Sequence, residues 1–109
     1  MIEINENITY KSVTVSGAVC VIDVSTKKLG SGMELIARLT GIYISDAARQ
    51  ADPVANRLEH GWPNELRRNY DRATESDDIL QLAHEMWRGF FIDPELGNFD
   101  PANVNITGL

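Results

Sequence analysis

Residues 79–90 read ILQLAHEMWRGF, and this stretch sets the fold expected for the chain. Thr74 and Asp77 stand three residues apart just upstream, close to the pattern of a capping box. Gly89 and Pro94 bracket the end of the segment. The sequence predicts a long amphipathic helix with His84 on its polar face. Its apolar side chains recur at the i, i+3, i+4, i+7 spacing of one helix face: Ile79, Leu82, Ala83, Met86, Trp87 and Phe90.

Shorter helices are expected upstream of this one. Apolar residues recur every three or four positions there, and breakers such as Gly41 separate the segments. Pro53 suits the first turn of a helix because its missing N–H is not needed at that position. The expected helical segments are 33–39, 47–50, 53–60 and 64–73.

The first quarter of the chain predicts strands instead. Ile2–Ile4 alternates, residues 8–15 are rich in β-branched side chains, and residues 18–24 form a nearly continuous apolar run. Asn5–Asn7 and Ser16-Gly17 are the expected turns, and residues 25–32 the loop that ends the sheet.

The expected fold class is α+β: a small antiparallel N-terminal β-meander followed by three to four helices packed on one face. Residues 103–106 can add one edge strand. The strand over residues 8–15 is another expected edge, which leaves a homodimer open.

The length of 109 residues suits a single domain. Its expected parts are a β-rich segment 1–25, a helical segment 33–91 and an acidic, turn-rich tail 92–109. No run approaches the roughly 20 apolar residues of a membrane span, and the start lacks the pattern of a signal peptide. We therefore expect a cytoplasmic protein without a membrane partner. Cys20 is the only cysteine and lies in an apolar run, which indicates a buried thiol rather than a metal ligand or a disulfide.

Charge is distributed unevenly along the chain. Residues 74–109 hold seven acids and one base, Arg88, whereas residues 1–73 hold nine acids and nine bases. The net charge of −6 thus arises from the last third. This asymmetry disfavours nucleic acid as a ligand of that third and favours a basic partner.

The candidate partner-binding residues come from this acidic third and from two aromatic side chains, one tryptophan and one phenylalanine, at predicted breaks between helices or strands. Trp62 and Phe99 are candidate interface anchors because aromatic residues are enriched at protein–protein interfaces. Five of the seven acids also have a structural explanation, as helix N-terminal residues or turn formers. The complete set is Trp62, Glu75, Asp77, Asp78, Asp93, Glu95, Phe99 and Asp100.

No nucleophile elbow, His-Glu-x-x-His motif or phosphate-binding loop occurs, so we expect neither an enzyme nor a cofactor. The favoured function is a small acidic inhibitor, of the immunity or antitoxin type or a phage-encoded antagonist. It would occlude a basic partner that handles nucleic acid, such as a nuclease. Its carboxylates would occupy the arginine and lysine sites meant for phosphates.

Two other functions stay open. Residues 45–60 have the spacing of a helix-turn-helix, in which Asn56 and Arg57 would read bases. Phosphate contacts would then come from Arg49, Arg67, Arg68 and Arg72. Alternatively, the chain is a subunit of a small enzyme, with His60 or His84 in a site completed by another chain.

Overall fold

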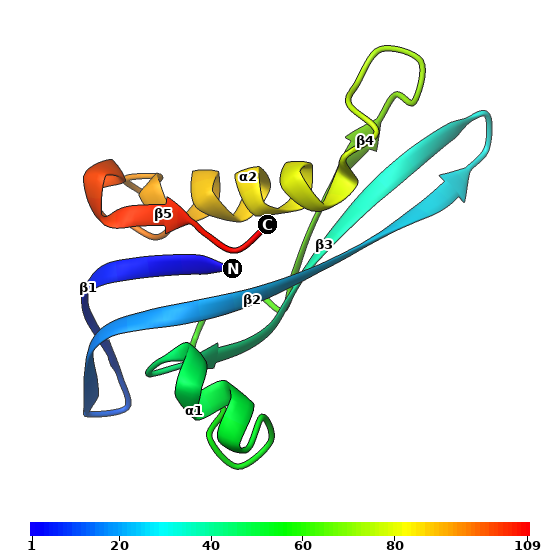
Figure 1. The fold of residues 1–109 in the computed structure, drawn as a ribbon. Helices are drawn as coiled ribbons and strands as arrows, with labels where there is room; N and C mark the ends of the chain where they lie inside the picture. Colours follow the sequence, from blue (N-terminus) through cyan, green and yellow to red (C-terminus); the bar gives the residue numbers. More distant parts are fainter.

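The computed structural model describes residues 1–109, and its centre is one five-stranded antiparallel sheet (Figure 1). The strands lie side by side in the order β4-β3-β2-β1-β5, so β4 and β5 are the edges. In chain order the elements are β1 (Ile2–Tyr10), β2 (Val13–Leu29), β3 (Gly32–Tyr43), α1 (Asp46–Ala51), β4 (Glu65–Tyr70), α2 (Ile79–Ile92), the 3-10 turn η1 (Pro101–Asn103) and β5 (Val104–Ile106).

The core lies between α2 and one face of the sheet. Trp87 and Phe91 of α2 are fully buried there, and the indole Nε1 of Trp87 donates to the Ala37 carbonyl at 3.0 Å. The sheet contributes alternate residues of each strand, as expected for a strand with one face against a core. These side chains are Ile2, Ile4, Ala18, Cys20, Ile22, Ala37, Leu39, Ile42 and Val104.

The opposite face of the sheet carries charged side chains across β2, β3 and β4. Arg38 stands directly between Asp23 and Glu65 on the neighbouring strands, so the three side chains form a row of alternating charge. Arg67 adds ion pairs to Glu65 and Glu34, each at 2.9 Å. At one end of this face Tyr43 is buried, and its hydroxyl donates to the Pro53 carbonyl at 2.6 Å.

The expected fold class is wrong in its second half: the structure is mostly a five-stranded antiparallel sheet with only two α-helices. Residues 33–39 belong to strand β3 and residues 65–70 to strand β4, where helices were predicted. Residues 53–60 form turns and irregular chain. Only α1 and α2 match predicted helices, and the edge strand near residues 103–106 is confirmed as β5.

The first hairpin also differs from the prediction. Its turn lies at Lys11 and Ser12, and both residues have positive φ (48° and 67°). Gly17, predicted as part of the turn, lies within β2 with φ of 79°, opposite a bulge in β1. Residues 5–7 continue β1, and residues 25–29 continue β2, so the predicted turn and loop there are wrong.

Candidate functional site

The acids of the last third are arranged around α2. Glu75, Asp77 and Asp78 precede its first turn, whereas Asp93, Glu95 and Asp100 follow its last turn. The helix has 14 residues. With a rise of 1.5 Å per residue it is about 21 Å long, so the two groups lie at opposite ends. The predicted acids therefore do not all lie together: they form two groups, one at each end of α2, with Glu85 between them.

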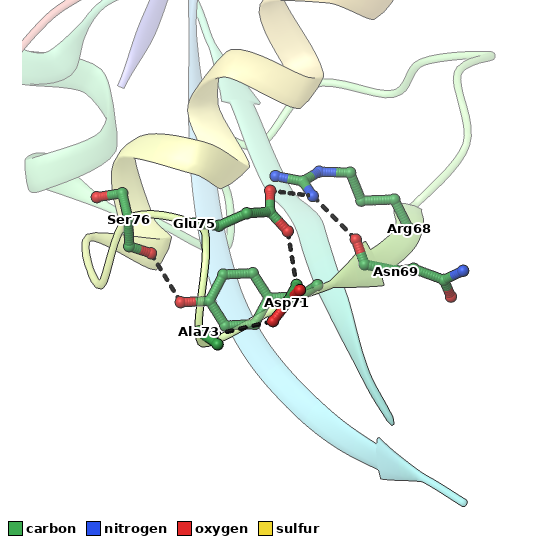
Figure 2. A network of polar contacts seen from close by, with 7 residues as sticks. Arg68, Asn69, Asp71, Ala73, Glu75 and Ser76 are labelled. Carbon is green, nitrogen blue, oxygen red and sulfur yellow. Dashed lines mark hydrogen bonds and ion pairs between the residues drawn. The ribbon is translucent and has the colours of Figure 1, made fainter. Parts of the chain in front are cut away.

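Glu75 is engaged in a network that joins the end of β4 to the start of α2 (Figure 2). Its Oε1 accepts from Arg68 Nη1 at 2.7 Å, and its Oε2 accepts from the Asp71 backbone N–H at 2.8 Å. The Asp71 N–H, and after it the Arg68 guanidinium, lower the pKa of this carboxyl. The Tyr70 hydroxyl donates to the Ser76 carbonyl at 2.7 Å in the same network. Glu75 therefore shapes the turn and offers little free charge.

Three further acids cap backbone N–H groups. Asp78 is the N-cap of α2 and accepts from the Gln81 N–H at 3.1 Å. Asp93 accepts from the Glu95 N–H at 2.8 Å, and Asp100 from the Ala102 N–H at 2.9 Å. These bonds agree with the structural roles expected of acids at helix starts and turns. They leave the negative charges at the surface, because no basic side chain pairs with them.

Asp77 and Glu95 are the acids whose carboxylates have no intramolecular hydrogen bond or ion pair, and both are exposed. Arg88 is the only base in residues 74–109, and it points into the protein rather than toward them. Its Nε donates to the Val104 carbonyl and its Nη2 to the Pro101 carbonyl, both at 2.9 Å. The acidic charge around α2 is therefore not neutralised by ion pairs within this segment.

The solvent-facing side of α2 carries one more acid, Glu85. Glu85 lies seven residues after Asp78, which places the two carboxylates about two turns apart on one side of the helix. Gly89 follows on the same side, and a Cβ built there would meet no atom within 4 Å. We call Asp77, Asp78, Glu85, Asp93, Glu95 and Asp100 the α2 acidic surface.

Trp62 and Phe99 meet at one end of the core. Trp62 packs edge-on against Phe91 with ring centroids 5.0 Å apart, and Phe99 lies 6.0 Å from Trp62. Both side chains are half-buried, so a large part of each ring is already packed within the protein and is not available to a partner. The leucines Leu80 and Leu96 are more exposed, at 40% and 58%. The sequence analysis did not select these two leucines as interface candidates. Their positions could have indicated exposure, because Leu80 lies off the apolar stripe of α2 and Leu96 lies in a turn.

The two histidines are fixed in different tautomers by their hydrogen bonds. His84 is 2% exposed, so its predicted place on the polar face is wrong. Its Nδ1 lies 2.7 Å from the Leu80 carbonyl and must carry the proton, because a carbonyl only accepts. His60 Nδ1 accepts from the Trp62 N–H at 3.1 Å, which leaves its proton on Nε2. Burial lowers the pKa of both imidazoles.

Residues 45–60 do not form a helix-turn-helix. The short helix α1 is followed by turns, so the predicted recognition helix is absent. Asn56 Nδ2 donates to the Ala48 carbonyl at 2.8 Å and stabilises these turns. Arg67 and Arg68 are paired with glutamates. The two-helix arrangement that would place Asn56 and Arg57 in a major groove is therefore missing.

No protein-family model matches this chain, and no curated protein or solved structure matches it. No group of three or more His, Cys, Asp or Glu side chains is placed to hold a metal ion. None of the helices combines the length and the apolar character that crossing a bilayer requires. Cys20 is buried, and burial raises the pKa of its thiol to about 12.

Proposed function

We propose that this chain is a protein-binding inhibitor that docks through the α2 acidic surface on a basic partner, such as an enzyme that handles nucleic acid. The observation that carries the proposal is the uncompensated charge around α2. Six of the seven acids of residues 74–109 make no ion pair and lie along this helix or at its ends, and the one base among them is bonded to backbone carbonyls. A surface of one sign steers an oppositely charged partner and favours a fixed orientation.

The dimensions of the surface support an extended contact rather than a single ion pair. The acidic clusters are separated by the length of α2, about 21 Å. Two basic sites on the partner that normally hold phosphates several nucleotides apart would meet the clusters at the two ends of α2. Leu96, beside the second cluster, is 58% exposed and supplies an apolar contact next to the charges. Trp62 and Phe99 contribute only the edges that the core leaves uncovered.

Charge reversal tests this proposal. Asp77→Lys with Glu95→Lys changes two acids that have no partner within the chain, so the fold is expected to persist. The control is Asp23→Lys with Glu59→Lys, which makes the same change in net charge at exposed positions away from α2. Circular dichroism checks that this control folds, because Asp23 lies opposite Arg38 on the next strand and Glu59 lies 3.8 Å from Lys11. Each tagged variant is used as bait in a lysate of the organism that carries the gene, with elution in rising salt and quantitative mass spectrometry.

The expected result is a basic protein that the native chain and the control variant retain, that salt releases, and that the α2 variant fails to retain. Salt sensitivity follows because exposed charges are screened beyond about 8–10 Å at physiological ionic strength. Retention of the same protein by both variants would place the interface elsewhere. A lysate that yields no basic protein with the native bait would count against the inhibitor function.

A further inference from the structure

A groove of about 260 Å³ lies between the end of the β1–β2 hairpin and residues 57–60, which follow α1. In Figure 1 the hairpin end is the dark blue turn next to the green α1 segment. The Leu58 N–H donates to the Ile42 carbonyl at 2.8 Å, so the loop wall is attached to the end of β3. The apolar lining consists of seven side chains, of which only Val13 is exposed: Ile8, Tyr10, Val13, Val15, Ala18, Ile42 and Leu58.

The rim of this groove is polar and carries more positive than negative charge. Lys11 lies 3.8 Å from Glu59, an exposed and therefore weak ion pair. Arg57 makes no ion pair and donates no side-chain hydrogen bond, although it lines both this groove and an adjoining polar hollow. His60 lines both as well, and its Nε2–H is not used by the Trp62 contact. An unpaired cation thus stands where an apolar floor meets a polar opening, in a chain of net charge −6.

We propose that the groove binds a small apolar carboxylate, with its hydrocarbon part on the apolar floor and its carboxylate on Arg57. The class follows from the lining, because a guanidinium matches a carboxylate with two parallel hydrogen bonds. The size follows from the volume. A cavity of about 150 Å³ holds benzene, so one of 260 Å³ holds a ligand of roughly ten non-hydrogen atoms.

The site is separate from the α2 acidic surface. Its lining comes from β1, β2, the end of β3 and the loop after α1, and includes no residue of α2. Ligand binding here and partner binding there can therefore succeed or fail independently.

The test uses the full chain and 3-phenylpropionate, with the neutral 3-phenylpropanol as the matched ligand and octanoate as a second acid. Binding is followed by chemical-shift changes in a two-dimensional amide NMR titration. We expect saturable shifts confined to the hairpin end and residues 57–60, and an affinity for the acid about tenfold above that for the alcohol. Arg57→Gln is expected to reduce the acid affinity to that of the alcohol and to leave the alcohol affinity unchanged. The fold is expected to persist because Arg57 is exposed.

Two further variants fix the location and the role of charge. Arg72→Gln removes an exposed cation elsewhere and is expected to leave both affinities unchanged. Val15→Trp fills the floor and is expected to abolish binding of acid and alcohol alike, with retained amide dispersion as the check on folding. The proposal is overturned if neither acid gives a saturable shift by about 10 mM, if acid and alcohol bind equally, or if Arg57→Gln binds the acid as the native chain does.

Discussion

The two ends of the sheet differ in what holds them in place. Where β1, β5 and the adjacent parts of β2 and β3 lie under α2, side chains such as Trp87, Phe91 and Ile2 are fully buried. The far end of the β2–β3 hairpin, residues 26–33, extends beyond the helix (Figure 1). Its residues 27–32 are all exposed. One end is therefore held by apolar burial, and the other by backbone pairing and cross-strand contacts.

The largest loss of stability is expected from a change at Trp87, in the end of the sheet that α2 covers. Trp87→Ala removes the largest fully buried side chain and the hydrogen bond to the Ala37 carbonyl. The free energy of unfolding is expected to fall by about 3–5 kcal/mol, measured by urea denaturation followed by circular dichroism. The control is Trp62→Ala, whose half-buried ring should cost less. A loss at Trp87 no larger than that at Trp62 would contradict a core centred under α2.

The next largest loss of stability is expected at Gly97, in the loop that follows α2. The loop after the helix folds back there, and its Gly97 N–H donates to the Phe90 carbonyl at 3.1 Å. A Cβ on Gly97 would overlap the backbone of Phe91, so Gly97→Ala should lower the free energy of unfolding by about 1–3 kcal/mol. Gly89→Ala is the matched control. It adds the same methyl group in open space within α2 and should stabilise by about 0.5–1 kcal/mol. Equal effects of the two changes would show that the loop is not packed on the helix end.

The helix-covered end is also expected to respond to pH. Burial lowers the pKa of His84 below its ordinary 6.5, so the unfolded chain binds the proton more readily than the folded chain does. The stability that comes from keeping His84 neutral is fully present above pH 6.5. It is lost as the pH falls from 6.5 toward the lower pKa of His84 in the folded chain. Urea denaturation at pH 7.5 and 5.5 should show this loss, and His84→Gln should reduce it. His60 has the same sign of shift, so some pH dependence should remain in the variant. An unchanged pH dependence in His84→Gln would exclude His84 as its source.

The spacing of apolar residues explains how far the fold could be predicted from the sequence alone. Leu66 and Tyr70 are four residues apart, and this spacing fits one face of a helix and one face of a strand equally well. β4 uses the second option. In α2 the apolar pairs Leu82-Ala83 and Met86-Trp87 are adjacent and four residues apart, which a strand with one buried face does not allow. The prediction therefore held for α2 and failed for β3 and β4.

The candidate sites were predictable to different degrees. Acids at helix starts and turns follow from local rules, and Asp78, Asp93 and Asp100 take such positions. The groove beside Arg57 depends on a hairpin turn at Lys11-Ser12, which lacks the Asn-Gly signal usual for two positive φ angles. It also depends on the long-range bond between Leu58 and Ile42, which no local pattern encodes. His84 was misplaced because its spacing to Trp87 and Phe91, three and seven residues, was outweighed by its polarity.

The smallest effect is expected at the tip of the extended hairpin. Leu29 is 45% exposed and pairs with Gly32 at the last rung of the β2–β3 ladder, before a turn in which Gly30 has a φ of 57°. Leu29→Ser removes little burial, so the free energy of unfolding should change by no more than about 0.5 kcal/mol in urea denaturation. Leu35→Ser, on the neighbouring strand but fully buried, should cost several times more. If both leucines prove equally costly, the tip is packed against something that the single chain does not contain, and its support by strand pairing alone is wrong.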